Sequence, residues 1–113
     1  MENFPAGSKI PRSLIEKATR HVFLCIGPDC CDMAEHAALW DLLKAETKPL
    51  PVLRTKAACL RICKDGPWLV VYPDGTWYGR MTPDKLRRIL REHVVEGNPV
   101  REWIAAEMPC LAK

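Results

Sequence analysis

HVFLCIGPDCCDMAEHAALWDLL, residues 21–43, passes from strand character to helix character within a few positions. Its first six residues form a compact apolar run that ends at a Gly-Pro pair, which is typical of a buried strand. Beyond that pair, Asp29 or Asp32 can cap a helix, and leucines with a tryptophan form one apolar stripe on MAEHAALWDLLKAE. The stretch therefore predicts a strand followed closely by an amphipathic helix.

Three further apolar runs predict three more strands. They are VLRTK at 52–56, PWLVVY at 67–72 and TWYGRM at 76–81. A Pro-Asp-Gly turn joins the last two runs, and this turn chemistry is a strong hairpin signal. The C-terminal half of the chain is therefore expected to contain an antiparallel pair of strands.

A second main helix is predicted after the hairpin. Thr82 suits the cap position and Pro83 the first helical position, and apolar residues follow at helical spacing until Gly97. The whole order is strand, helix, strand, hairpin and helix, with one parallel crossover. We therefore predict an α/β fold of the thioredoxin-like kind, in which two main helices pack against a small four-stranded mixed sheet.

The length of 113 residues is that of one domain with extensions at both ends. We expect residues 1–20 to form an N-terminal leader, because prolines and a glycine interrupt its first half. Residues 21–113 are expected to form the domain. They include a C-terminal extension from about residue 98, where NPVREWIAAEM predicts a short final helix.

Composition narrows the class of protein. Hydrophobic residues make up 48% and charged residues 27% of the chain, an ordinary globular balance, and the formal net charge of +3 is too small to indicate a nucleic-acid partner. No apolar run is long enough to span a membrane, and the first twenty residues lack the apolar core of a signal peptide. We therefore expect a cytoplasmic protein with no nucleic-acid or membrane partner, in a reducing compartment where structural disulfides are rare.

Five of the six cysteines fall into two groups. Cys25, Cys30 and Cys31 follow the first predicted strand, and Cys59 and Cys63 follow the second. Because the carboxyl ends of parallel strands meet at one edge of a sheet, we expect the two groups to meet in space. Several thiolates brought together suit zinc or an iron–sulfur cluster, and amide donors at a helix start stabilise their negative charge.

The cysteine spacings distinguish the candidate sites only in part. A thioredoxin-type redox pair needs C-x-x-C at the helix start, and no C-x-x-C occurs in the chain. C-x4-C with C-x3-C is a poor match both to a zinc knuckle and to the plant-type ferredoxin spacing. A zinc-stabilised binding module remains an alternative to an iron–sulfur protein, as does a thiol redox sensor or oxidoreductase that uses Cys30 and Cys31.

Two blocks of sequence carry a resemblance to a known family. HVFLCIGPDCC and AACLRICKDGPWLVVYPDGTWYGRMTP, with the α/β pattern between them, resemble the thioredoxin-like 2Fe–2S ferredoxins and the small 2Fe–2S subunit of respiratory NADH dehydrogenase. The resemblance covers roughly residues 20–104. Its most specific part is C-x3-C followed by Gly-Pro, an apolar strand and the YPDGTWYG hairpin. It implies one 2Fe–2S cluster held by four cysteines and one-electron transfer between redox partner proteins. No nucleophile–base pair, substrate motif or phosphate loop stands out in the sequence, so we expect an electron carrier and not an enzyme.

The resemblance also implies a set of ligands, carried over by position. Cys25 matches the first ligand, Cys59 the third and Cys63 the fourth. Cys30 matches the second by the C-x4-C spacing of the respiratory subunit. Cys31 is the alternative, because many of these ferredoxins have a longer loop between their first two ligands. Cys110 lies outside the pattern, and we expect it to be a free thiol.

Basic side chains flank the third and fourth cysteines. They are Arg54, Lys56, Arg61 and Lys64. They are explained equally well by solubility and by a basic rim that docks an acidic surface of a redox partner. Ferredoxins of this kind are often homodimers, so a homodimer is a further expectation.

The remaining polar and aromatic residues carry weaker signals. The histidines at 21, 36 and 93 are scattered, and we expect all three to be structural or solvated. The aromatic residues of the hairpin are expected to serve ordinary strand packing, with shielding of a cluster as the alternative.

Overall fold

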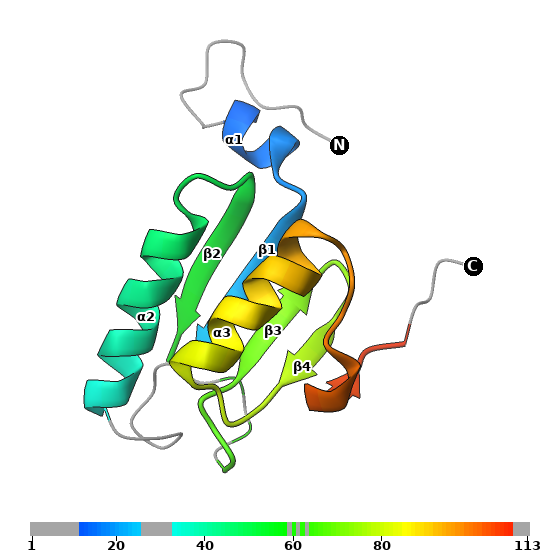
Figure 1. Ribbon diagram of the computed structural model, residues 1–113. Helices are drawn as coiled ribbons and strands as arrows, with labels where there is room; N and C mark the ends of the chain where they lie inside the picture. The colour runs from blue at the N-terminus through cyan, green and yellow to red at the C-terminus, as the bar shows by residue number, and fades with distance from the viewer. Residues whose placement is uncertain (1–11, 26–32, 59, 61, 63, 110–113) are drawn as a thin grey trace, which may run out of the picture.

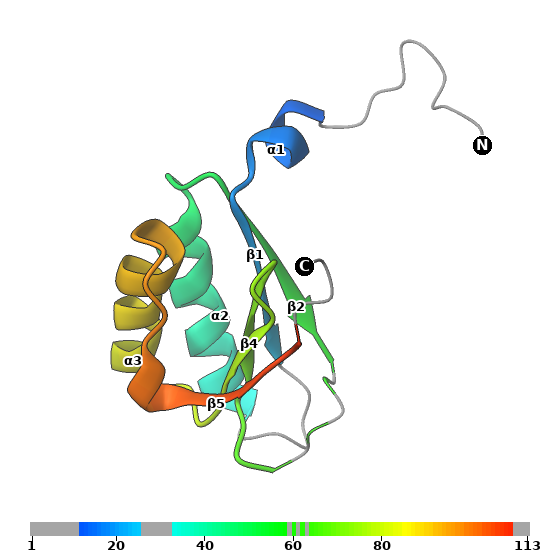
Figure 2. The same cartoon turned by 90° about the vertical axis from the view of Figure 1, so that its right-hand side faces the viewer.

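The computed structural model describes residues 12–25, 33–58, 60, 62 and 64–109. In this part of the chain, a mixed sheet carries two helices on one of its faces (Figures 1 and 2). The elements in chain order are α1 (Arg12–Lys17), β1 (Arg20–Cys25), α2 (Met33–Thr47), β2 (Val52–Ala57), β3 (Leu69–Tyr72), β4 (Thr76–Tyr78), α3 (Pro83–Ile89), the π-helical turn η1 (Leu90–Val95), the 3-10 turn η2 (Arg101–Trp103) and β5 (Ile104–Glu107).

The strands lie in the order β2-β1-β3-β4-β5. β1 and β2 run parallel, and α2 makes the crossover between them. The pairs β1–β3, β3–β4 and β4–β5 are antiparallel. The parallel crossover and the hairpin of β3 with β4 therefore follow the sequence prediction.

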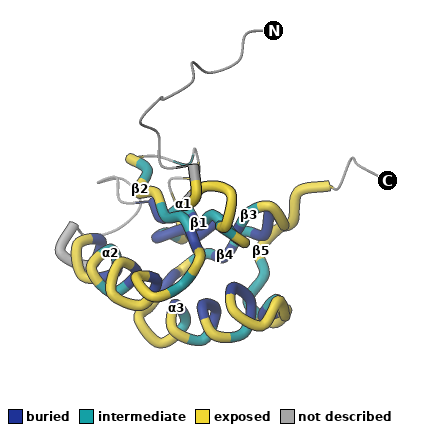
Figure 3. The backbone as a smooth tube through the Cα atoms, turned by 90° about the horizontal axis from the view of Figure 1, so that it is seen from above, coloured by how far each residue is buried: buried dark blue, intermediate teal, exposed yellow. Residues whose placement is uncertain are grey.

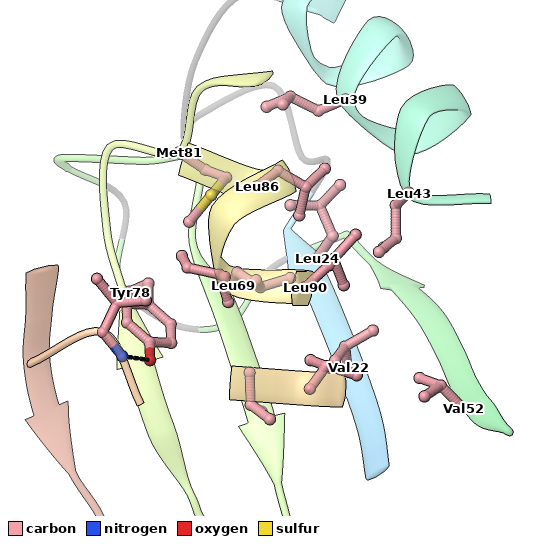
Figure 4. Close-up of a cluster of buried hydrophobic side chains, with 14 residues drawn as sticks. Val22, Leu24, Leu39, Leu43, Val52, Leu69, Tyr78, Met81, Leu86 and Leu90 are labelled. Atoms are coloured by element: carbon pink, nitrogen blue, oxygen red, sulfur yellow. Dashed lines mark hydrogen bonds between the residues drawn. The ribbon is translucent and has the colours of Figure 1, made fainter. Parts of the chain in front are cut away.

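The core lies between the sheet and the two main helices. Val22 and Leu24 of β1, Leu39 and Leu43 of α2, and Leu86 of α3 share one layer in which each is at most 2% exposed (Figure 4). The outward faces of both helices are exposed, as Figure 3 shows. Each buried leucine or valine contributes about 1.5–3 kcal/mol, so this layer is the main stabilising contact between helices and sheet.

The start of α3 follows the predicted capping pattern. The backbone N–H of Lys85 donates to Oγ1 of Thr82 at 3.3 Å, and Pro83 occupies the first turn. The helix continues through η1, and Gly97 follows with a φ of +80°, a conformation that favours glycine. The chain therefore leaves the helix where the sequence predicts.

The sheet of the described residues has five strands, so the predicted four-stranded sheet is wrong, and the predicted final helix is confined to one 3-10 turn. Residues 101–103 make a 3-10 turn without a side-chain cap, and Ile104–Glu107 continue as β5 beside β4. Without β5, one edge of β4 would leave backbone N–H and C=O groups unpaired. Pairing with that edge outweighs the helix propensity of the alanines and glutamate in this segment.

The N-terminal part of the described chain joins the sheet directly. Residues 12–17 form the short helix α1, and the backbone N–H of Thr19 donates to the carbonyl of Pro51 at 2.8 Å. β1 begins at Arg20. The division of the chain into a leader and a domain at residue 20 stays a prediction.

Candidate functional site

The site is built around Cys25, the last residue of β1. Cys25 is fully buried, and in the parallel pairing of β1 with β2 it lies opposite Ala57, the last residue of β2. Cys59 follows Ala57 by two positions in the chain. Cys25 and the C-terminal end of β2, which leads to the second group of cysteines, therefore lie at the same edge of the sheet, as predicted from the strand order. Cys30, Cys31, Cys59, Cys63 and Cys110 lie outside the described residues.

Trp68 forms an apolar wall beside Cys25. The backbone N–H of Cys25 donates to the carbonyl of Trp68 at 3.0 Å, and the two side chains belong to one buried cluster. Leu60 and Trp77 pack against this cluster, and the rings of Trp68 and Trp77 meet edge to face at 6.2 Å. Ordinary hairpin packing was expected for these tryptophans, and the contacts of Trp68 and Trp77 fit it, while both rings also belong to the surroundings of Cys25.

The segment after Cys63 is anchored to the exit of β4. The backbone N–H of Arg80 donates to the carbonyl of Asp65 at 2.7 Å, and the Arg80 guanidinium donates to Oδ1 of Asp65 at 2.7 and 3.0 Å. The hydrogen bond and charge of Arg80 lower the pKa of Asp65 below its ordinary value. The indole N–H of Trp68 also donates to the carbonyl of Lys64 at 2.9 Å. Residues 64–68 are therefore held in place from both sides.

Gly79 makes this anchoring sterically feasible. A Cβ atom at position 79 would lie 2.9 Å from Cη2 of Trp68 and 3.1 Å from the carbonyl oxygen of Asp65. Both distances are shorter than an ordinary carbon contact. Only glycine leaves room for the indole to pack at this point.

His36 is a buried histidine in the first turn of α2. It is 3% exposed, and neither ring nitrogen has a hydrogen-bond partner among the described residues. The other two histidines have partners: His21 bonds to Oγ1 of Thr55 at 2.8 Å, and His93 bonds to the hydroxyl of Tyr78 at 2.8 Å. The expectation of a structural role therefore fits His21 and His93, but the structure gives His36 no such partner.

The predicted basic rim loses one member. The Arg54 guanidinium is 3.4 Å from the hydroxyl of Thr47, the last residue of α2, at the end of the helix remote from its start. Lys56 lies nearer the end of β2, with its ammonium 5.7 Å from the ring of Trp40, and Lys64 is exposed. Arg61 lies outside the described residues. Because its guanidinium reaches the last residue of α2, Arg54 lies away from the start of that helix and from the proposed site, although it is close to Cys59 in the sequence.

The sheet face opposite α2 and α3 carries an apolar hollow of about 560 Å³. It is lined by His21, Phe23, Leu60, Val70, Tyr72 and Trp77. Leu60 and Trp77 also pack against the cluster that contains Cys25. The hollow is therefore continuous with the wall of the candidate site.

The described residues alone form neither a metal site nor a membrane-spanning helix. Within residues 12–25, 33–58, 60, 62 and 64–109, no three side chains of His, Cys, Asp or Glu lie close enough together to hold a metal ion. No helix in the described part of the chain is long and apolar enough to cross a membrane.

Curated relatives of the chain are ferredoxins. No protein-family model matches the chain. The 2Fe–2S ferredoxin of Aquifex aeolicus is 28% identical over 78% of this chain and 90% of its own length. A Priestia megaterium protein, whose provisional name is that of a 2Fe–2S ferredoxin, is 32% identical over 77% of this chain and 70% of its own length.

A solved structure shares the fold. The thioredoxin-like [2Fe–2S] ferredoxin from Aquifex aeolicus superimposes with a TM-score of 0.73, over 85% of this chain and 98% of that one, at 24% identity. The superposition confirms the thioredoxin-like α/β prediction, whereas the resemblance to the respiratory subunit stays a prediction. By relatedness and fold together, the chain belongs to the 2Fe–2S ferredoxins, which are small electron carriers and not enzymes.

Proposed function

We propose that Cys25, Cys30, Cys59 and Cys63 hold one 2Fe–2S cluster and that the chain carries single electrons between redox partner proteins. The observation that supports this proposal is the register of β1 and β2, which places Cys25 opposite Ala57, two residues before Cys59. When bound, such a cluster supplies a one-electron couple.

The residues present fit this group. Iron–sulfur clusters take cysteine thiolates as ligands, and the two cysteine groups supply five candidates, of which Cys25 lies at the end of β1. Cys25 is a free thiol with an apolar wall on one side, so it is available as a ligand. Cys30 is the proposed second ligand, and Cys31 is its alternative.

The surrounding residues would control the site in two ways. Trp68, with Leu60 and Trp77, keeps water from the buried side of Cys25. The contacts of Arg80 with Asp65 hold the segment that follows Cys63. Burial and fixed hydrogen bonds are the protein's means of setting the reduction potential of a cluster.

We propose a redox partner with an acidic docking surface. Lys56 and Lys64 are exposed near the end of β2 and in the loop after Cys63, and Arg61 lies between the third and fourth cysteines. Opposite charge across an interface speeds encounter and orients the partners. The proposed compartment is the cytoplasm, whose reducing conditions keep thiols available as ligands.

We also propose that the apolar hollow is covered by a second copy of this chain. None of its six lining residues carries a fixed charge. A two-fold dimer brings the same patch of both subunits together, so an uncharged face meets no like-charge repulsion there. Sedimentation velocity of the wild type and of Phe23→Glu tests this pairing. A dimer that Phe23→Glu dissociates is expected, and a monomeric wild type would contradict it.

Composition and spectra of protein made anaerobically with iron test the cluster. About two irons and two acid-labile sulfides per chain are expected, with the red-brown colour of a ferredoxin and a paramagnetic signal after one-electron reduction. Stoichiometric zinc without sulfide would instead indicate a zinc-stabilised module. Colourless protein with neither metal would indicate a thiol redox protein. Either result would overturn the proposal.

A further inference from the structure

We propose that a ring N–H of His36 donates a hydrogen bond to a sulfur atom at the cluster site and thereby raises the reduction potential. This inference rests on the proposed function. It concerns a residue for which the sequence indicated no more than a structural or solvated role.

The position of His36 places it at the correct end of the molecule. His36 precedes Leu39 by three residues and Leu43 by seven, so all three lie on the face of α2 that packs against the sheet. His36 is one turn nearer the start of the helix. That start lies at the same end of the molecule as the carboxyl ends of β1 and β2, where Cys25 lies (Figure 1).

The burial of His36 requires a polar partner. Among the described residues, three buried side-chain nitrogen or oxygen atoms lack a hydrogen bond: both ring nitrogens of His36 and Nε of Arg20. Nε of Arg20 at least lies 3.5 Å from a carboxylate oxygen of Asp74. An imidazole always presents at least one N–H donor, and a buried donor without an acceptor destabilises the fold. The described part of the chain supplies no acceptor for His36, and a group at the cluster site can be that acceptor.

Cluster sulfur is an acceptor of the required kind. Thiolate and sulfide sulfurs carry negative charge, and hydrogen bonds to them are among the factors that set the potential of a cluster. Reduction adds one more negative charge, so an N–H donor stabilises the reduced state more than the oxidised state. The tryptophan wall of Trp68 and Trp77 packs on Cys25, and His36 would reach the site from the helix-covered side of the sheet.

The test compares two variants of the cluster-loaded protein. His36→Leu removes the donor at similar volume, and His36→Gln keeps an N–H donor. Redox titration should show that His36→Leu lowers the equilibrium constant for one-electron reduction about tenfold, a shift of about 59 mV for one electron. His36→Gln should restore part of the shift.

A second measurement uses the wild-type protein, so its result does not require that a variant folds. Wild-type protein with 15N-labelled histidine should show a histidine nitrogen coupled to the reduced cluster in pulsed electron paramagnetic resonance. A tightly bound cluster with no such coupling, or one whose potential is the same in wild type and His36→Leu, would overturn the role of His36 and leave the proposed function intact. Wild-type protein without iron and sulfide would overturn both, and the two failures are therefore distinguishable.

Discussion

The backbone N–H of Cys25 donates a hydrogen bond to the carbonyl oxygen of Trp68 at 3.0 Å. This bond extends the pairing of β1 with β3 one step beyond Leu24 and Leu69. The indole N–H of Trp68 then donates to the carbonyl of Lys64, the residue directly after Cys63. Two hydrogen bonds thus connect the first proposed ligand to the neighbour of the fourth, so this part of the site belongs to the framework of the sheet.

Removal of single cysteines tests the ligand set. Cys25→Ala, Cys59→Ala and Cys63→Ala should each lose or badly destabilise the cluster, because one iron would lack its thiolate. Iron and sulfide counts with visible spectra measure the loss. Cys110→Ala is the matched control and should keep the cluster. Each ligand change is repeated in a chain that already carries Cys110→Ala, so that this thiol cannot substitute.

Iron and sulfide counts with visible spectra also decide whether Cys30 or Cys31 is the second ligand. Successive side chains leave the backbone in different directions, so normally one of Cys30 and Cys31 can point to a single site. Cys30→Ala should lose the cluster, and Cys31→Ala should retain it. The reverse result would make Cys31 the second ligand. Retention in both variants would mean that either thiol can serve.

Gly79→Ala should disturb the wall beside Cys25. The added methyl group would lie 2.9 Å from Cη2 of Trp68, so the indole or the backbone has to move. Such overpacking costs about 1–3 kcal/mol, and we expect a lower free energy of unfolding and faster loss of the cluster. Urea unfolding and the decay of cluster absorbance measure these effects.

A double-mutant cycle identifies the cause of the Gly79→Ala effect. Trp68→Phe removes the part of the indole that the new methyl group would meet. The cost of Gly79→Ala should therefore be smaller in the Trp68→Phe background than in wild type. Additive costs would show that the methyl group acts through the carbonyl of Asp65, 3.1 Å away, and not through the indole.

Much of the fold could be predicted from local patterns. The period of apolar residues gave β1, α2 and the hairpin, and the cap at Thr82 gave the start of α3. β5 could not be predicted in this way, because the segment around Ala105 is composed of helix formers. Its strand conformation comes from the free edge of β4, a partner distant in sequence.

The candidate site was predictable for its backbone and less so for its side chains. The meeting of Cys25 with the end of β2 follows from the rule that parallel strands end at one edge. Arg54 was wrongly assigned to the rim, because proximity to Cys59 in sequence says nothing of strand direction. The lack of a partner for His36 depends on packing between α2 and the sheet, which no local pattern records.

Tyr78→Phe should destabilise the fold through a buried network. The Tyr78 hydroxyl bonds to Nδ1 of His93 at 2.8 Å and accepts the backbone N–H of Val100 at 3.1 Å, while Nε2 of His93 bonds to Asp74. A neutral His93 that donates from Nε2 to the Asp74 carboxylate accepts the Tyr78 hydroxyl proton at Nδ1. The variant leaves two buried groups unpaired, at a cost of about 1–3 kcal/mol each in the free energy of unfolding.

Tyr72→Phe is the matched control for this network. Within the described residues, its hydroxyl donates to the sulfur of Met108 at 3.2 Å, in an exposed position. Its loss should change the free energy of unfolding by no more than about 0.5 kcal/mol. Equal losses in the two variants, measured by urea unfolding, would argue against the buried network as the source of stability.

His21 should make stability depend on pH in mildly acidic solution. Burial lowers the pKa of His21 below its ordinary value of 6.5, so the folded chain binds fewer protons than the unfolded chain in the window just below pH 6.5. The stabilisation is fully present above pH 6.5 and is lost as the pH falls through that window. His21→Phe keeps an aromatic ring on Phe23, with which His21 stacks at 4.2 Å, and removes the titration.

Urea unfolding at a series of pH values compares wild type with His21→Phe. The variant should show a flatter dependence of the unfolding free energy on pH within this window. Proton resonances of the His21 ring, followed in the folded protein, give the direction of the pKa shift directly. A ring that titrates above 6.5, or an identical slope in the two proteins, would refute the prediction.

Charge reversal at the site should slow electron transfer in a salt-dependent manner. Arg61→Glu with Lys64→Glu replaces two basic side chains around the proposed third and fourth ligands. If the partner presents an acidic surface, repulsion should lower the second-order rate with a candidate reductase at low salt. The Debye length falls from about 10 Å at 0.1 M to about 3 Å at 1 M salt, so the rates of variant and wild type should converge there.

A control pair of substitutions separates docking from net charge. Lys17→Glu with Lys48→Glu changes the net charge equally. Lys17 is the last residue of α1 and Lys48 directly follows α2, and both are exposed. α1 and the end of α2 lie at the opposite end of the molecule from the end of β1 (Figure 1). The control should slow the reaction much less than the pair at the site. Equal slowing would show that the partner senses only the overall charge. Steering by exposed charges always fades with ionic strength. A rate that is unaffected by salt and by both pairs of substitutions would therefore mean that Arg61 and Lys64 serve solubility and not docking.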